Sequence, residues 1–270
     1  MSTLVRHLNC ATMHPPAAKL GVMPDRLVAH CLLVESDDGL TLVDTGLGAG
    51  DVADPKRLGG PFVKAVGATL DLDETAVAQV QALGYAPADV REVVLTHLDL
   101  DHAGGLGDFP HARVHVFGDE LTAARARRHA KEKGRYIAAQ WAHGPVWVEH
   151  SADGSDDWFG FEAVQAVGED VLMIPLPGHT RGHCAVAVRR PSGGWFLHAG
   201  DAYFFTGEKQ RPATCPSGLK VFQSMVQMDK RARLANQERL RELNATHGDE
   251  VTIFSAHDAS EYDALAGATD

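Results

Sequence analysis

The 270-residue sequence predicts a layered α/β domain, because short apolar runs of strand character alternate with segments of helical periodicity. Hydrophobic residues make up 44% of the chain and charged residues 23%, a globular composition that excludes disordered and fibrous classes. Polar clusters that contain glycine directly follow several predicted strands. Ligands usually bind at the carboxyl ends of strands in α/β proteins, so these clusters are the candidate functional segments.

The first half of the chain opens with two apolar runs separated by a sequence with hairpin-turn chemistry, SDDGL at 36–40. The next element is expected to be a helix, since its apolar residues recur at helical spacing. In chain order we expect strands at 26–35 and 41–44, a helix at 73–83, strands at 90–96 and 112–117, and a helix at 119–133.

The second half begins with residues 136–157, which are rich in Trp, His and Gly and are expected to form an irregular inserted loop or cap. Strands are then expected at 171–175, 184–189, 194–198 and 251–254, with a helix at 228–244. Met228, Leu234 and Leu240 of that helix favour core or dimer packing, which leaves a homodimer open. With no linker or repeat between the elements, residues 1–270 are expected to form a single domain.

The net charge of the chain and its lack of long apolar stretches also limit the partners that it can bind. Lys plus Arg number 25 and Asp plus Glu 36, and the net charge of −11 argues against a nucleic acid partner. No apolar stretch approaches the roughly 18 to 20 residues that span a bilayer, and residues 1–16 lack the pattern of a secretory signal. Four cysteines without CxxC spacing fit a reducing compartment. We therefore expect a cytoplasmic protein that binds neither nucleic acid nor membrane.

Potential metal ligands follow four separate predicted strands. They lie in the motifs HLDLDHAGG at 97–105, PGHTRGH at 177–183, AGD at 199–201 and SAHD at 255–258. Fifteen histidines without paired cysteines favour nitrogen and oxygen ligands over a thiolate zinc site or a disulfide framework. Because strand ends can converge on one rim of a layered fold, these residues are expected to bind common ions.

These motifs, in this order, resemble the metallo-β-lactamase superfamily of hydrolases. The signature of that family is a His-x-His-x-Asp-His loop, then a single His, a bridging Asp and a last His. The VDTG sequence at 43–46 is also similar to an early strand-end element of the family. The resemblance covers about residues 26 to 258 and implies an αββα four-layer sandwich with the site on the rim between two sheets.

The resemblance further implies two divalent metal ions. The first would be bound by His97 and His179, the second by Asp101, His102 and His257, and Asp201 would bridge both.

The second histidine of the signature is replaced by Asp99, which we expect to bind the first ion directly, the alternative being a hydrogen bond to a neighbouring ligand. A carboxylate is a harder ligand than imidazole, so the expected preference moves from zinc toward iron or manganese. With Asp101 and Asp201, it gives the site a formal charge of −3.

Other polar residues near the motifs are expected to have structural roles. Asp44 is expected to cap or orient the backbone, and His183 to pack or to orient its loop. His115 and His198 are expected to be core histidines, and Cys184 a buried strand residue. The basic run at 125–131 is expected to be a solvated helix face.

The implied chemistry is attack of a metal-bound hydroxide on a carbonyl whose oxygen is polarised by an ion. Asp101 would hold or accept the proton and then help to protonate the leaving group. Tyr203 would donate a hydrogen bond to the oxyanion, unless it is a packed aromatic residue near a strand end.

An apolar cluster follows the bridging Asp201 and suggests a substrate with an apolar acyl part. Its members are Tyr203, Phe204, Phe205, Phe222 and Met225. The chain most resembles the lactonase branch of the family, which opens acyl-homoserine lactones and related esters. The alternatives are a thioesterase resembling glyoxalase II, an iron-dependent redox enzyme such as a persulfide dioxygenase, and a metal-stabilised binding module without turnover.

Overall fold

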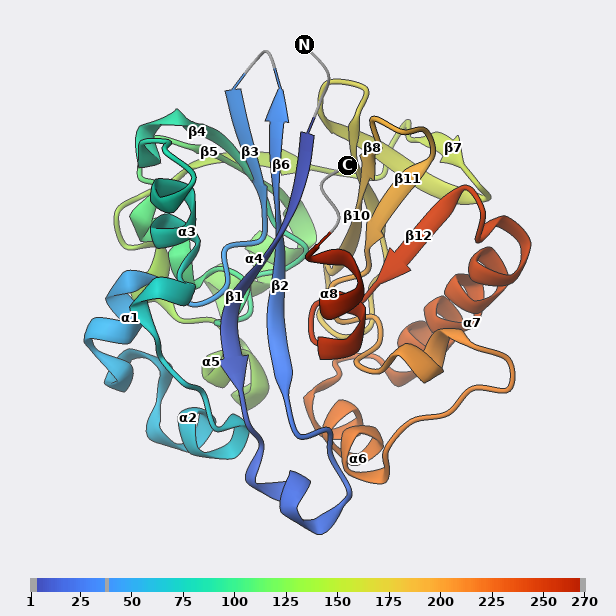
Figure 1. Cartoon of the computed structure of the whole chain (residues 1–270), viewed down its shortest axis with the longest axis horizontal. Helices are drawn as coiled ribbons and strands as arrows, with labels where there is room; N and C mark the ends of the chain where they lie inside the picture. The colour runs from blue at the N-terminus through green and yellow to red at the C-terminus, as the bar shows by residue number, and fades with distance from the viewer. Residues whose placement is uncertain (1–3, 37–38, 268–270) are drawn as a thin grey trace.

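Two six-stranded β-sheets face each other in the computed structural model, which describes residues 4–36 and 39–267 (Figure 1). The first sheet has the order β1-β2-β3-β4-β5-β6 and the second β12-β11-β10-β9-β8-β7. The strands of the first sheet are β1 (Leu4–Met13), β2 (Leu27–Ser36), β3 (Gly39–Val43), β4 (Val90–Val94), β5 (Arg113–Phe117) and β6 (Val146–His150). The strands of the second are β7 (Asp156–Trp158), β8 (Phe161–Val167), β9 (Val171–Pro175), β10 (Cys184–Arg189), β11 (Trp195–His198) and β12 (Val251–Phe254).

Helices lie on the outer faces of both sheets in Figure 1, with α1 to α3 on the side of the first sheet and α7 on the side of the second. The helices are α1 (Ala49–Ala53), α2 (Gly60–Val66), α3 (Ala76–Ala82), α4 (Gly118–Ala126), α5 (Ala130–Arg135), α6 (Ser217–Val226), α7 (Lys230–His247) and α8 (Ala259–Leu265). The arrangement is the αββα sandwich that the sequence predicts.

The alternation of side chains along each strand builds three apolar layers. Between the sheets, Leu32 and Val34 of β2 pack in one cluster with Val186 of β10 and Phe254 of β12. Leu33, which lies between the first two in sequence, points to the opposite face, into the cluster that includes α3. Leu240 of α7 packs with the outer face of the second sheet. This burial on both faces explains why the central strands are continuous apolar runs.

Strand direction brings the polar clusters to one rim. β3, β4, β5 and β6 are parallel neighbours in the first sheet, and β11 and β12 are parallel neighbours in the second. The two rims are joined by backbone hydrogen bonds, including Cys184 N to Thr96 O at 2.9 Å and His30 N to Ala256 O at 2.8 Å. The segments that follow β3, β4, β11 and β12 therefore meet in one place.

Two predicted elements differ from the structure. The helix expected at 119–133 is divided into α4 and α5, because Arg127 adopts a left-handed conformation with φ of +41°. Part of the segment 136–157, expected to be irregular, forms β6, which pairs in parallel with β5 and completes the first sheet. The hairpin predicted at SDDGL falls partly on residues 37–38, outside the described residues, although Ser36 lies opposite Gly39 in the antiparallel pair.

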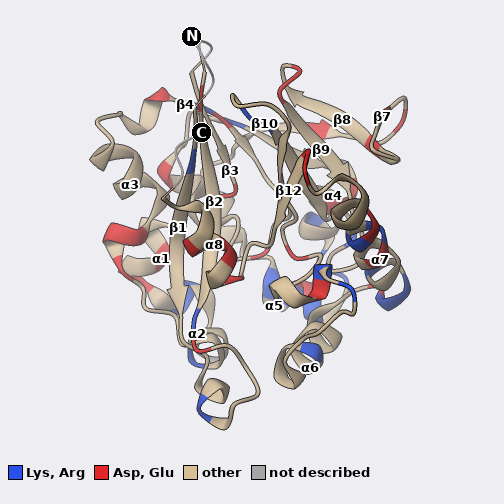
Figure 2. Cartoon of the chain, turned by 45° about the vertical axis from the view of Figure 1, so that its right-hand side comes forward, with Lys and Arg blue, Asp and Glu red and all other residues tan. Residues whose placement is uncertain are grey.

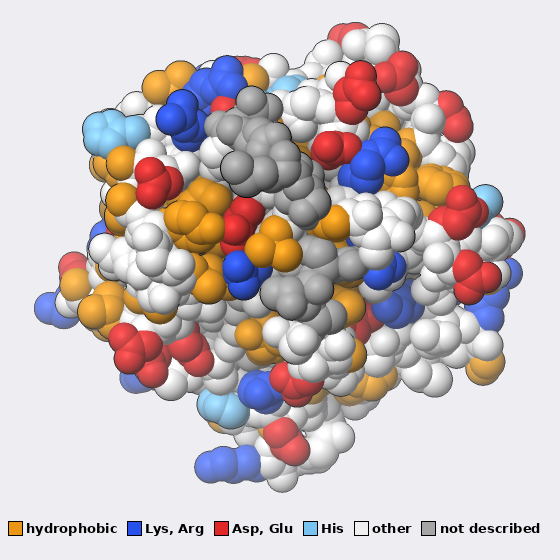
Figure 3. All heavy atoms as spheres, turned by 45° about the horizontal axis from the view of Figure 1, so that its top comes forward, with side chains coloured by type: hydrophobic (Ala, Val, Ile, Leu, Met, Phe, Trp, Pro, Cys, Tyr) orange, Lys and Arg blue, Asp and Glu red, His pale blue; other side chains and the backbone are white. Residues whose placement is uncertain are grey.

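Charge is unevenly distributed over the helices. Basic residues occur on α5, α6 and α7, whereas α1 carries the acidic Asp51 and no basic residue (Figure 2). On the face in Figure 3, acidic, basic and apolar side chains are interspersed wherever the described residues are visible. Within the described part of the chain, no helix has the length and apolarity needed to cross a membrane.

Candidate metal centre

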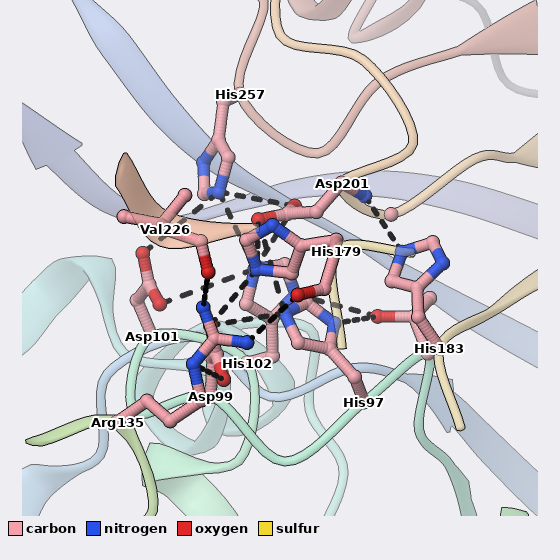
Figure 4. A network of polar contacts seen from close by, with 12 residues as sticks. His97, Asp99, Asp101, His102, Arg135, His179, His183, Asp201, Val226 and His257 are labelled. Carbon is pink, nitrogen blue, oxygen red and sulfur yellow. Dashed lines mark hydrogen bonds and ion pairs between the residues drawn. The ribbon is translucent and has the colours of Figure 1, made fainter. Parts of the chain in front are cut away.

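A first group of ligand atoms gathers where the loops after β4, β9 and β11 meet (Figure 4). His179 Nε2 lies 2.9 Å from Asp99 Oδ2 and 3.3 Å from Asp201 Oδ2. His97 Nε2 lies 3.5 Å from Asp99 Oδ2 and 3.8 Å from Asp201 Oδ2. Two nitrogens and two carboxylate oxygens therefore converge from segments about a hundred residues apart in sequence.

A second group of ligand atoms gathers around Oδ1, the other carboxylate oxygen of Asp201. Asp201 Oδ1 lies 3.3 Å from His102 Nε2 and 3.2 Å from His257 Nε2, and these two nitrogens are 3.3 Å apart. Asp101 completes the group, with one oxygen 4.0 Å from His102 Nε2 and the other 3.8 Å from His257 Nε2. Asp201 thus presents one carboxylate oxygen to each group, as a bridging residue would.

The spacing and the unpaired atoms of both groups fit metal ions. Ligands about 2.0–2.1 Å from a tetrahedral ion are about 3.3 Å from one another, which is close to most of these separations. Among the described residues, His97 Nε2 and Asp201 Oδ1 are buried without a hydrogen-bond partner. Buried polar atoms normally have partners, so atoms that lack them here are available to a ligand. The residues present can therefore hold two ions.

Hydrogen bonds on the outer side of three histidines direct their Nε2 atoms inward. Asp44 Oδ2 accepts from His102 Nδ1 at 2.8 Å, and the Val28 carbonyl accepts from His257 Nδ1 at 2.8 Å. Thr96 Oγ1 donates to Asp44 at 2.7 Å and lies 2.9 Å from His97 Nδ1, from which it can accept. These contacts fix the tautomer that leaves Nε2 free to bind a metal.

His183 supports the loops without joining either group, as the sequence predicts. Its Nδ1 donates to the Leu176 carbonyl at 3.0 Å, and its Nε2 accepts from the backbone N–H of Asp201 at 2.9 Å. The imidazole therefore sets the position of the bridging aspartate through its backbone.

Two glycines allow the loops to approach closely. Gly104 donates its N–H to the Gly46 carbonyl at 2.9 Å, and a Cβ on Gly104 would lie 2.5 Å from that oxygen. Gly178 has φ of +144°, and a Cβ there would lie 2.4 Å from Arg233 N in α7. No other residue type fits either position without displacing backbone.

The electrostatic environment differs between the two groups. Burial lowers the pKa values of His102 and His257, but the negative charge of Asp201 outweighs it and raises both above the usual value. For His179 burial prevails, and the pKa falls to about 4. Burial raises the pKa of Asp201, yet the surrounding imidazoles hold it well below its usual range. In the absence of metal, His102 and His257 therefore hold protons at pH values at which the His179 side chain is neutral.

Asp99 has a buried cationic neighbour. Arg135 Nε lies 3.4 Å from Asp99 Oδ1, while Nη1 donates to the His179 carbonyl at 3.0 Å and Nη2 to the Val226 carbonyl at 2.7 Å. Burial raises the pKa of Asp99, but Arg135 and the nearby imidazoles outweigh it and hold the pKa well below its usual value. Asp99 is thus an anion that contacts both a candidate ligand and a fixed guanidinium.

Comparison with known proteins identifies the family. The family model described as "Metallo-beta-lactamase superfamily" matches residues 24–243. The chain belongs to the metallo-beta-lactamase superfamily.

Two relatives with similar sequences and one solved structure support the same assignment. A probable metallo-hydrolase of Mycobacterium tuberculosis is 41% identical over 261 residues, covering 96% of this chain and 81% of the relative. The N-acyl homoserine lactonase AttM of Agrobacterium fabrum is 28% identical over 230 residues, covering 84% of this chain and 80% of that protein. The crystal structure of a Bacillus thuringiensis AiiA mutant with N-decanoyl-L-homoserine bound at its active site has a TM-score of 0.71 and 21% identity, over 98% of this chain and 97% of that one. The last comparison shows a shared fold.

In this superfamily member the two ligand groups open into a cavity of about 220 Å³. Its apolar wall is formed by Phe62, Leu100, Phe204, Phe222, Met225 and Val226. Phe204 stacks on the candidate ligand His257, with ring centroids 5.1 Å apart, and meets Phe222 edge to face. The predicted apolar cluster therefore contributes Phe204, Phe222 and Met225 to the cavity, whereas Tyr203 and Phe205 are not among the described lining residues.

The structure does not bring Tyr203 to the candidate metal centre. Its side chain is 1% exposed, and its hydroxyl lies 3.1 Å from both carboxylate oxygens of Glu261. Lys209 Nζ contacts the same carboxylate at 2.6 Å. Because Tyr203 lies in the loop after β11, where side chains do not follow the alternation of a strand, the motif alone cannot distinguish this packed position from one facing the cavity.

The remaining sequence predictions concern structural residues. His198 is buried and lies 2.5 Å from the His30 carbonyl, His115 contacts Glu92 at 2.8 Å, and Cys184 lies in β10 without exposure. In the helix α7, Leu240 is a core residue, whereas Leu234 is 42% exposed. In the basic run, the Arg125 side chain is 57% exposed and pairs with Glu149, as expected of a solvated face. Lys131 differs, because it lines the cavity and donates to the Gln227 carbonyl at 3.0 Å.

Arg135 is a charged site residue that sequence reasoning missed. It lies at the junction between the expected helix and the expected irregular segment, where no motif marks it. The one available signal was indirect, because an extra buried carboxylate at Asp99 requires a nearby cation.

Proposed function

We propose that this metallo-hydrolase opens lactones, or cleaves related esters, that carry an apolar acyl part. The observation that carries the proposal is that the two candidate metal-ligand groups line one cavity, and that this cavity has an apolar wall. Similarity to an N-acyl homoserine lactonase over 84% of the chain supports the same substrate class.

The proposed ligands are the residues that the resemblance implies, together with Asp99 in the place of the signature's second histidine. His97, Asp99 and His179 would hold one ion, Asp101, His102 and His257 the other, and Asp201 both. Divalent ions at such a site supply an activated water near neutral pH and polarise the carbonyl of the substrate.

Asp101 is the proposed proton carrier. It lines the cavity, and its side chain retains 14% exposure, the largest among the carboxylates of the two groups. A carboxylate at this position can hold the proton of an attacking water and transfer it to the leaving oxygen. The apolar wall would bind the acyl chain and exclude bulk water from the reacting carbonyl.

Metal analysis of the purified protein, combined with lactone, thioester and phosphoester assays, tests the proposal. We expect about two metal ions per chain and hydrolysis of acyl lactones. An Asp101→Asn variant keeps the shape of the side chain, and we expect it to lower kcat by about 10²- to 10⁴-fold. One iron per chain with dioxygen uptake, or turnover of thioesters without lactones, would contradict the proposal.

A further inference from the structure

Asp99 and Arg135 form a buried pair of opposite charges beside the first ligand group. Arg135 is 7% exposed and Asp99 is 8% exposed, so water screens their charges poorly. Arginine keeps its charge in any protein environment. Both residues also line the cavity with the ligand groups, so the guanidinium contributes its charge where the ions would lie.

The orientation of Arg135 is fixed by three contacts that come from three parts of the chain. Its end nitrogens donate to carbonyls of the loop after β9 and of the last residue of α6, and its Nε faces Asp99 Oδ1 at 3.4 Å (Figure 4). The other oxygen of Asp99 faces His179 Nε2 at 2.9 Å and His97 Nε2 at 3.5 Å. One carboxylate oxygen therefore faces the arginine and the other faces the two imidazoles.

We propose that Asp99 and Arg135 act together as a neutral metal-ligand unit, in which Asp99 supplies the ligand oxygen and Arg135 is a positioning residue that cancels its charge. Asp99, Asp101 and Asp201 alone give the site a formal charge of −3. Including Arg135 changes the sum to −2, which equals that of a site with a neutral imidazole at position 99. The pair therefore keeps the formal charge that the ions meet equal to that of a site with histidine at position 99, although the ligand atom there is an oxygen.

The inference rests on the metal binding of the proposed function but does not depend on its substrate. Its test is therefore a metal-affinity measurement on full-length protein, made by zinc titration of the chelator-treated chain against a competing chromophoric chelator. The variants are Asp99→His, Arg135→Lys and the double variant Asp99→His with Arg135→Gln, each checked for folding by circular dichroism.

We expect Asp99→His alone to weaken zinc binding about 10- to 100-fold, because it leaves an unpaired guanidinium beside the ion. The double variant removes that charge and should return to within about threefold of the original affinity, a strong departure from additivity. Arg135→Lys keeps the charge and should also remain within about threefold. The matched control is Arg181→Gln in the Asp99→His background, because Arg181 lies near His179 in sequence but pairs with Glu132 at 2.9 Å. This control variant should bind zinc as weakly as Asp99→His alone.

Three outcomes would overturn the proposal. If Asp99→His binds zinc as well as the original chain, the charge of Arg135 does not act on the site. If the double variant is as weak as Asp99→His, or if Arg135→Lys is also weak, the role of Arg135 is to brace the two carbonyls and not to balance charge. Loss of lactone turnover with these affinities intact would count against the proposed substrate and leave the pair supported.

Discussion

Asp44 Oδ2 accepts a hydrogen bond from His102 Nδ1 at 2.8 Å, with both residues almost completely buried. Asp44 has φ of +57° and also accepts from the backbone N–H of Thr96 at 2.8 Å. The residue that follows β3 therefore holds the imidazole of His102, in the loop after β4, in one orientation. Asp44 is therefore not a metal ligand itself, but it orients the candidate ligand His102.

Replacing Asp44 should weaken the second ligand group. Asn tolerates the left-handed backbone, so Asp44→Asn removes the charge with little backbone strain. We expect metal affinity at this group to fall by about 10- to 100-fold, measured by metal content after dialysis against a chelator. Asp170→Asn is the control, since Asp170 is half-exposed and pairs with Arg189 on the surface. Unchanged metal content in Asp44→Asn would show that His102 needs no such support.

Metal uptake should depend on pH through the second group. Asp201 raises the pKa values of His102 and His257 against the effect of burial. In the metal-free chain, the stability that their charged forms contribute is fully present below about pH 6.5 and is lost as pH rises through the raised pKa values. Metal must displace these protons, so binding strengthens as pH increases.

The pKa of His179, lowered to about 4, means that this imidazole needs no deprotonation near neutral pH. We therefore expect about one ion per chain at about pH 6 and about two at about pH 8, and a metal-induced rise in Tm that increases over the same interval. Mass spectrometry under native conditions and calorimetry measure the two quantities. Equal occupancy at both pH values would contradict the assignment of the protons to His102 and His257.

The apolar wall predicts selectivity for acyl length. Phe222 lines the cavity, whereas its neighbour Val221 is 58% exposed on the other side of α6. Removing the Phe222 ring should lower kcat/KM for a long-chain lactone by about tenfold and change that for a short-chain lactone much less, since only the long chain loses contact. Val221→Ala should leave both unchanged. An equal loss for short and long chains in Phe222→Ala would place the acyl chain elsewhere.

Tyr203→Phe separates a packed tyrosine from a catalytic one. Because the hydroxyl pairs with Glu261 away from the cavity, we expect kcat to be unchanged. The lost hydrogen bond should cost about 0.5–1.5 kcal/mol, which corresponds to a fall in Tm of about 1–6 °C for a chain of this size. Steady-state kinetics and thermal unfolding are the two measurements. A large loss of kcat without loss of stability would restore the catalytic role.

The elements that the sequence predicts well are those whose pattern is local. The strand at 184–189 is a continuous apolar run, and the motif residues His97 and His257 follow directly after such strands, so their convergence could be inferred from sheet geometry. β1 was not predicted, although its Leu8 and Cys10 pack in the core, because its apolar residues alternate irregularly with polar ones.

Features that depend on tertiary contacts could not be predicted in this way. The break between α4 and α5 occurs at Arg127, a residue type with good helix propensity and no turn chemistry. β6 lies at the edge of the sheet and has exposed or partly buried side chains, so it lacks the continuous buried run of a central strand. Arg135 is recognisable only once Asp99 is placed beside it.

The hydrogen bond from Arg135 to the Val226 carbonyl has a consequence for how this chain could change over evolutionary time. Val226 ends α6, the helix that carries Phe222 and Met225, and the same guanidinium holds the His179 loop. A substitution that tilts α6 to admit a different acyl group would also move the Val226 carbonyl, to which Arg135 donates a hydrogen bond. New substrate preference and altered metal choice are therefore expected to arise together, through compensating replacements at 99, 135 and the end of α6.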